Sequence, residues 1–189
     1  MTLEELFEQR KATPWNMNEH MDTLRRYASE CDHVTEFGTH VGFSTTAFLM
    51  GKPKELHCWD INRQPEVSTL EDLAAQNGVN MVFHNESSLA ANFETTELLF
   101  IDSLHQYDQV IQELQMHAHK ATKYLILHDT IAWGYIDEWP SDNPTDINYA
   151  WAHKKGVAQA LGHYMIDHPE WKIYEQFYHN CGLTIYHRG

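Results

Sequence analysis

Carboxylate and imidazole side chains follow two apolar segments of the sequence. Asp102 and His105 come after the run Leu-Leu-Phe-Ile, and His128 and Asp129 come after the apolar segment 124–127. Buried strands that end in such groups are costly unless the groups are paired or used in chemistry. If both strand ends face one cleft, Asp102, His128 and Asp129 suit a divalent metal ion, and His105 suits proton transfer. The alternative is a structural hydrogen-bonded pair at the edge of a sheet.

Two glycines four residues apart, Gly38 and Gly42, follow the expected strand 33–37. This spacing allows a sharp turn and leaves bare backbone against which a ligand can lie. The dinucleotide fingerprint G-x-G-x-x-G is not met, because His40 occupies the place of its second glycine, and no G-x-x-x-x-G-K-[ST] phosphate loop is present. The segment is therefore either a cofactor-binding loop or a plain strand-to-helix turn.

Acidic residues follow the second and third expected strands as well. Asp60, 24 residues after Glu36, stands where a carboxylate can accept hydrogen bonds from a ribose diol. Glu86, followed by Ser87, can accept a hydrogen bond from an amino group such as that of adenine. The alternatives are a solvated Asp60 that caps a turn and a Glu86 that favours a helix N-terminus.

Strand-like and helix-like apolar periods alternate along the chain, which predicts a doubly wound α/β fold with a parallel sheet covered on both faces. Ligands bind such sheets at the carboxyl ends of the strands. Residues 171–178 and 183–187 are expected to form a terminal hairpin. We also expect Asn16 to cap a helix around Met17–Ala28 and His117 to face solvent. The other expected strands are 33–37, 55–60, 81–83, 97–101 and 124–127.

The composition is that of an ordinary globular protein. The chain has 189 residues, 42% of them hydrophobic and 21% charged, so we expect a single domain over 1–189 with a helical N-terminal extension 1–31. The net charge of −14 would repel a phosphate backbone and argues against a nucleic-acid partner. Three distant cysteines suit a reducing cytosol, and no apolar run could span a membrane. We therefore expect a cytoplasmic protein without a membrane partner, and leave open whether it forms a homo-oligomer.

Taken together, these motifs resemble class I S-adenosylmethionine-dependent methyltransferases, in particular their small-molecule O-methyltransferase-like branch. Residues 34–45, VTEFGTHVGFST, are similar to that branch's first motif, E-x-G-x-x-x-G-x-S-T. Residues 100–107, FIDSLHQY, are similar to its F-I-D-x-x-H-x-Y segment, and residues 127–130, LHDT, to its H-D-T strand end. The likeness extends from about Asn16 to Arg188 and depends on the order and spacing of the motifs.

The resemblance implies a Rossmann-like methyltransferase fold, with a mostly parallel seven-stranded sheet whose last strand is antiparallel. It implies S-adenosylmethionine as the cofactor, with its methionine part on the glycine loop, its ribose on Asp60 and its adenine near Glu86. The cofactor-binding residues expected on this basis are Glu36, Gly38, Thr39, His40, Gly42, Ser44, Asp60, Glu86, Ser87 and Asp102.

The resemblance also bears on the metal. Metal-dependent relatives place acidic ligands after the fourth and fifth strands, and these positions match Asp102 and Asp129, with His128 beside them. The usual third ligand, an acid or amide, is replaced here by His128 or Thr130. A bound ion would be Mg²⁺ or Mn²⁺.

We expect methyl transfer to a small molecule, at a hydroxyl oxygen, with His105 and Asp129 as catalytic residues. Methyl transfer is an in-line displacement, so positioning supplies most of the catalysis, and His105 is a suitable base for the proton of the hydroxyl. Residues 130–151 form either a plain surface insertion or a lid that grips the acceptor through Trp133, Tyr135, Trp139 and Tyr149. The alternative function is a non-catalytic cofactor- or metal-binding module of the same fold.

Overall fold

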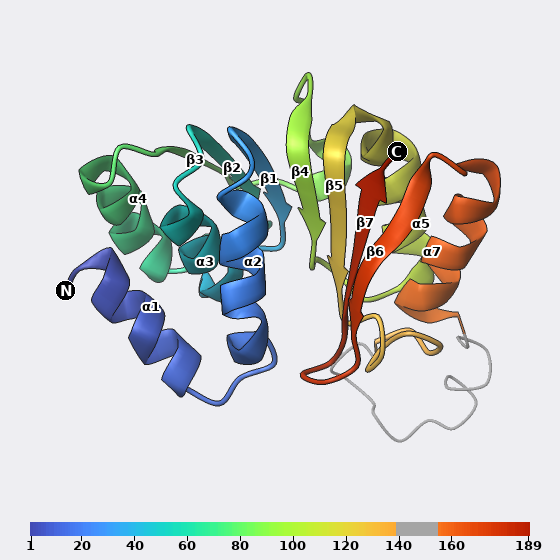
Figure 1. The fold of residues 1–189 in the computed structure, drawn as a ribbon, viewed down its shortest axis with the longest axis horizontal. Helices are drawn as coiled ribbons and strands as arrows, with labels where there is room; N and C mark the ends of the chain where they lie inside the picture. The colour runs from blue at the N-terminus through green and yellow to red at the C-terminus, as the bar shows by residue number, and fades with distance from the viewer. Residues whose placement is uncertain (139–154) are drawn as a thin grey trace.

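A seven-stranded sheet forms the centre of the computed structural model, which describes residues 1–138 and 155–189 (Figure 1). The strand order is β3-β2-β1-β4-β5-β7-β6. β1 to β5 pair in parallel, and β7 runs antiparallel to both β5 and β6. This confirms the doubly wound, mostly parallel sheet with a C-terminal antiparallel hairpin. The strands are β1 (His33–Phe37), β2 (Glu55–Trp59), β3 (Asn80–His84), β4 (Thr96–Ile101), β5 (Ala121–His128), β6 (Trp171–Phe177) and β7 (Leu183–Arg188).

Helices cover both faces of the sheet (Figure 1). Side chains of α1 to α4 join one hydrophobic cluster with one face, and side chains of α5 and α7 join a second cluster with the other. Of the helices that the structure describes, none is long and apolar enough to cross a membrane. The helices are α1 (Leu3–Ala12), α2 (Met21–Ala28), α3 (Phe43–Gly51), α4 (Glu66–Gln76), α5 (Tyr107–His117), α7 (Gly156–Asp167), and the short 3₁₀ helices η1 (Asn18–His20), η2 (Ser88–Ala90) and η3 (Ala118–Lys120).

The central strands are apolar on both faces, as a sheet buried between two helical layers requires. In β4, Leu98 and Phe100 belong to one cluster, whereas Leu99 and Ile101 belong to the other. The parallel register aligns Ile101 with the ends of β1 and β5. The residues that follow these three strands therefore leave the sheet together, at its carboxyl edge.

Residues 1–31 contribute directly to the core. Phe7, Met21 and Leu24 are fully buried in the cluster that α3 and α4 also join. The expectation that Asn16 caps a helix is wrong: α2 begins at Met21, after the turn of η1, and neither helix has a side-chain cap. The side chain of Asn18 accepts a hydrogen bond from the Trp15 backbone N–H instead, so the turn 15–18 closes on itself.

The expectation that His117 faces solvent is also wrong. His117 follows Val110 by seven residues and so lies on the same face of α5, against the sheet. It is 1% exposed, and its ring lies 5.1 Å from that of Phe37 and 5.5 Å from that of Phe93. Burial lowers the pKa of this histidine to about 4, so it is a neutral core residue.

Candidate active site

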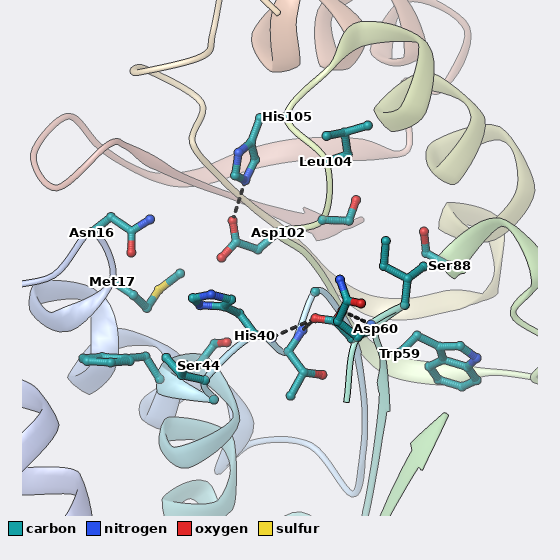
Figure 2. A pocket seen from close by; sticks show the side chains of 18 of the residues that line it. Asn16, Met17, His40, Ser44, Trp59, Asp60, Ser88, Asp102, Leu104 and His105 are labelled. Atoms are coloured by element: carbon teal, nitrogen blue, oxygen red, sulfur yellow. Dashed lines mark hydrogen bonds and ion pairs between the residues drawn. The ribbon is translucent and has the colours of Figure 1, made fainter. Parts of the chain in front are cut away.

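A cavity of about 510 Å³ lies at the carboxyl ends of β1, β2 and β4 (Figure 2). Figure 2 shows Asn16 and Met17 on one side of it and Trp59 and Ser88 on the other. Two of the expected cofactor residues, Glu36 and Glu86, are not part of its wall. The other eight line it: Gly38, Thr39, His40, Gly42, Ser44, Asp60, Ser87 and Asp102.

The glycines of the loop are needed for close packing of the chain. Both have positive φ, 91° at Gly38 and 83° at Gly42. A Cβ atom at Gly38 would lie 1.9 Å from the backbone oxygen of Asp102, and one at Gly42 would lie 2.3 Å from a side-chain carbon of Leu70. Their missing side chains thus face protein atoms, while their backbone forms part of the cavity wall.

Glu36 lies behind the loop, where it is fully buried. Its carboxylate accepts hydrogen bonds from the hydroxyls of Ser44 at 2.6 Å and Thr45 at 2.7 Å. Burial raises the pKa of Glu36 to about 7, although the hydrogen bonds from these hydroxyls oppose the shift. Glu36 therefore fixes the start of α3 beneath the loop instead of contacting the cavity.

Asp60 holds the glycine loop from the end of β2. Its Oδ2 accepts hydrogen bonds from the backbone N–H groups of Thr39 at 3.0 Å and His40 at 2.8 Å, and its Oδ1 accepts one from Asn62 at 2.8 Å. A carboxylate has about four lone-pair sites, so about one remains for a ligand in the cavity. Glu86 accepts a hydrogen bond from Trp59 Nε1 at 3.1 Å and is not part of the cavity wall.

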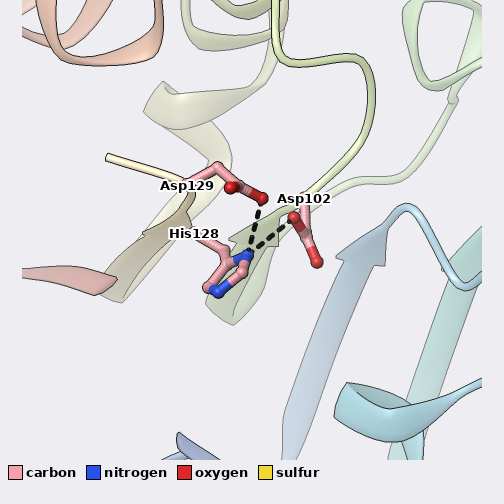
Figure 3. Close-up of side chains that lie close together, drawn as sticks. All are labelled: Asp102, His128 and Asp129. Atoms are coloured by element: carbon pink, nitrogen blue, oxygen red, sulfur yellow. Dashed lines mark hydrogen bonds and ion pairs between the residues drawn. The ribbon is translucent and has the colours of Figure 1, made fainter. Parts of the chain in front are cut away.

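Four titratable side chains meet where β4 and β5 end. Asp102 Oδ1 lies 3.0 Å from His105 Nε2 and 3.1 Å from His128 Nδ1. Asp129 Oδ2 lies 3.1 Å and 2.9 Å from the same two nitrogens, at ion-pair distance. The predicted juxtaposition of these strand ends is present (Figure 3), although only Asp102 and His105 reach the cavity. The structure shows the positions of these residues, and their catalytic roles stay predictions.

The charges in this cluster follow from its contacts. Burial by itself lowers the pKa of His105 and His128, but their contacts with carboxylates outweigh burial and raise both pKa values to about 10. Burial raises the pKa of Asp102, but the two imidazoles outweigh it and hold that pKa well below its ordinary value. In this arrangement, both rings are therefore cationic beside an ionised Asp102.

The predicted metal ligands lie close enough together to share a divalent ion, which His128 would bind through Nδ1 after losing its proton there. One ligand atom each from Asp102, His128 and Asp129 lies within 4.8 Å of the other two. His128 Nε2 lies 3.0 Å from the backbone oxygen of Asn16 and 3.1 Å from that of Asn180, so this nitrogen donates to carbonyls and Nδ1 faces the carboxylates. A backbone carbonyl that accepts a hydrogen bond from the other ring nitrogen, and so fixes the ring, is typical of metal-binding histidines.

Sequence reasoning missed the segment before α2 as part of the site. Trp15, Asn16 and Met17 line the cavity, although they are distant in sequence from the other lining residues. Trp15 stacks on His40 at a centroid distance of 6.4 Å and on Phe43 at 6.0 Å. A tryptophan in a short loop between two amphipathic helices was the only signal available in the sequence.

The lid predicted for 130–151 falls largely on residues 139–154, which lie outside the described residues; these include Trp139 and Tyr149. Of its described part, Glu138 lines the cavity and its Oε2 lies 3.0 Å from His105 Nδ1. Trp133 packs against the core, and Tyr135 is largely exposed. Asp137 is buried, where its carboxylate accepts hydrogen bonds from the backbone N–H groups of residues 107 and 156.

Comparison with solved structures shows the same fold. A candidate caffeoyl-CoA O-methyltransferase from Staphylococcus aureus aligns with a TM-score of 0.65 and 15% identity, over 100% of this chain and 93% of its own. An O-methyltransferase from Bacillus cereus, solved with S-adenosylhomocysteine, gives 0.64 and 14%, over 99% and 90%. An N-methyltransferase from Bradyrhizobium japonicum, also solved with S-adenosylhomocysteine, gives 0.60 and 12%, over 100% and 99%.

Comparison with known sequences identifies a family for this chain but no individual relative. No curated protein sequence matches this chain. The family model of a methyltransferase domain matches residues 35–130, just over half of the chain, from β1 to the residue Thr130 that follows the ionic cluster. This range contains the glycine loop, Asp60 and the cluster at the ends of β4 and β5. The chain therefore belongs to the methyltransferase domain family.

Proposed function

We propose that the protein transfers a methyl group from S-adenosylmethionine to a small molecule, at a hydroxyl oxygen. The observation that carries the proposal is the cavity of about 510 Å³, which joins the loop 38–42 and Asp60 to the ionic cluster. Its volume suits a small cofactor and a small acceptor side by side. Homologues of the same fold were solved with S-adenosylhomocysteine, the demethylated product, which supports this cofactor.

The cofactor is proposed to lie along the glycine loop. Its methionine part would contact the loop 38–42 and Ser44, its ribose Asp60, and its adenine Ser87, with Asp102 near the sulfur end. Glu36 would act from behind, through Ser44 and Thr45, and Glu86 through Trp59.

The acceptor is proposed to bind beside Asp102 and His105. Because Asp129 is 1% exposed, it would act through His105 or through a metal ion shared with Asp102 and His128. Mg²⁺ or Mn²⁺ suits two carboxylates, and Mn²⁺ better tolerates an imidazole ligand. When bound, such an ion lowers the pKa of a coordinated hydroxyl. His105 contacts both Asp102 and Glu138 and would thereby link these two parts of the cavity wall at its acceptor end.

The charge of the molecule supports a small acceptor. A net charge of −14 disfavours nucleic acid, and the carboxylates of Asp102 and Glu138 at the cavity disfavour an anionic acceptor. All three cysteines are unpaired, which supports a cytoplasmic location.

Calorimetry with S-adenosylhomocysteine tests the cofactor site. We expect the protein to bind this ligand and Asp60→Asn to weaken binding by at least about tenfold, because a charged hydrogen-bond acceptor is lost. Asp72→Asn, an exposed position of α4 outside the cavity, removes the same charge and should leave the affinity unchanged. No binding by the parent protein would overturn the proposal.

A turnover assay separates the enzyme from a non-catalytic module. S-adenosylhomocysteine release is measured with panels of phenols, alcohols and amines, each with chelator, Mg²⁺ or Mn²⁺. We expect turnover with a hydroxyl compound. Turnover only with amines would change the acceptor atom, and binding without turnover in every arm would identify a cofactor-binding module.

A further inference from the structure

Glu113 of α5 is fully buried beside the cavity without being part of its wall. Its carboxylate accepts hydrogen bonds from three segments of the chain: η2, the loop after β4, and the first turns of α5. Three residues of these segments, Ser88, Ser103 and Gln109, do line the cavity. Their polar groups are turned toward Glu113.

One oxygen of Glu113 receives three hydrogen bonds. Oε1 accepts from the hydroxyl of Ser88 at 2.5 Å, from the hydroxyl of Ser103 at 2.6 Å and from Gln109 Nε2 at 3.0 Å. Gln109 Nε2 also donates to the Ser88 hydroxyl oxygen at 3.0 Å. Both amide protons of Gln109 and both hydroxyl protons are therefore directed into the protein.

Counting donors and acceptors gives the polarity of this wall. A serine hydroxyl has a single proton and a glutamine amide has two, and the network uses all four. The hydrogen-bonding capacity that remains on these side chains is only accepting: the remaining lone pairs of Ser88 Oγ and Ser103 Oγ and the Oε1 of Gln109. These three side chains therefore present hydrogen-bond acceptors, which fit a ligand group with N–H donors.

We propose that Glu113 is a positioning residue that fixes this polarity, so that the wall accepts hydrogen bonds from the exocyclic amino group of an adenosyl ligand and rejects a carbonyl at the same place. The inference rests on the proposed function, since it places the adenine of the cofactor at this wall. A ligand carbonyl would face oxygen lone pairs without a proton between them, which leaves buried acceptors unsatisfied.

The protonation state of Glu113 does not alter the polarity. Burial raises the pKa of this carboxyl, against the hydrogen bonds that it receives. Its Oε2 has no hydrogen-bond partner among the described residues, so a proton carried there leaves Oε1 an acceptor. An amide oxygen would serve equally well, whereas an apolar side chain would leave the serine hydroxyls and the Gln109 amide free to turn their protons toward the cavity.

The test compares two ligands on three proteins by calorimetry. The ligands are S-adenosylhomocysteine and S-inosylhomocysteine, which differ at the exocyclic group on C6, amino against carbonyl, and at the neighbouring N1, acceptor against N–H donor. We expect the parent protein and Glu113→Gln to prefer the adenosyl ligand by at least about tenfold. In Glu113→Met, of similar length, the preference should fall to within about threefold.

Each outcome separates one hypothesis from the others. If the parent protein binds neither ligand, the proposed cofactor is wrong. If it binds the adenosyl ligand but Glu113→Met keeps the full preference, or Glu113→Gln loses it, Glu113 does not set the polarity. Equal weakening of both ligands in Glu113→Met would show a merely structural residue. Should Glu113→Met not fold, Ser88→Ala with Ser103→Ala removes the same hydroxyl acceptors and must lower the preference.

Discussion

Glu36 is fully buried behind the cavity and Asp102 lines it with a side chain 16% exposed, and the two carboxyl groups differ in charge. Glu36 is surrounded by the neutral hydroxyls of Ser44 and Thr45, and burial raises its pKa to about 7. Asp102 faces two imidazoles, which hold its pKa well below the ordinary value. Neutral donors stabilise a carboxylate less than cations do, so the type of partner adds to the difference in burial in setting the two pKa values.

The same difference separates structural from cavity-facing carboxylates. Glu36 and Glu113 lie behind the cavity wall and join segments through hydroxyl donors. Asp102 lines the cavity and is balanced by cations. The ionised carboxylate of Asp102 is thus accessible from the cavity, whereas Glu36 and Glu113 accept hydrogen bonds behind its wall.

Removing the charge of Asp102 should have the largest effect. In Asp102→Asn, the rings of His105 and His128 lose one of the two carboxylates that they share, and removing one partner of a buried ion pair costs about 3–5 kcal/mol. Urea unfolding at pH 7 measures this loss. Glu138→Gln removes a half-exposed carboxylate from the same His105 ring and should cost about 0–1 kcal/mol. Equal losses in the two variants would contradict the distinction between neutral and ionic surroundings.

The pH dependence of stability in Glu36→Gln tests whether the pKa of Glu36 is raised. Below pH 4.5 Glu36 is protonated in both states of the parent protein; between 4.5 and about 7 the unfolded chain ionises first, so folded stability falls as pH rises. The loss approaches about 3 kcal/mol by pH 8. The glutamine does not titrate, so the stability of the variant relative to the parent should rise from pH 5 to pH 8. Urea unfolding at both values measures this change, and a constant difference would show that Glu36 ionises normally.

Arg10 is a buried cationic group that also contacts the glycine loop, and its replacement should give the smallest of the three losses of stability. This buried arginine of α1 donates hydrogen bonds to the backbone oxygens of Gly42 and Val41, and burial lowers its pKa to about 10. We expect Arg10→Met to cost about 2 kcal/mol, because these carbonyls lose charged donors. Thermal and urea unfolding measure the change. The matched variant Arg63→Met, which breaks an exposed pair with Glu71, should cost less than about 1 kcal/mol, and a larger loss there would contradict the expectation.

The elements of the fold were predictable because each signal is local. β1 was predicted at its observed bounds, and the other strands within a few residues, since short apolar runs between turn residues are typical of strands buried on both faces. Errors arose at helix details. Asn16 precedes an extra 3₁₀ turn, and His117 shares the inner face of α5 with Val110, which a careful count of seven residues would have shown.

The sequence by itself determined which residues end the strands, and therefore that Asp60, Asp102 and Asp129 would lie at one edge of a parallel sheet. Only the tertiary structure decided which of them face the cavity. Whether a side chain can meet a ligand depends on partners from distant segments: the loop amides take up part of Asp60, which still lines the cavity, whereas Asp129 is buried against the two imidazoles. Trp15 and Glu113 became visible as neighbours of the cavity for the same reason, because packing across the sheet edge brings them there and no local period encodes it.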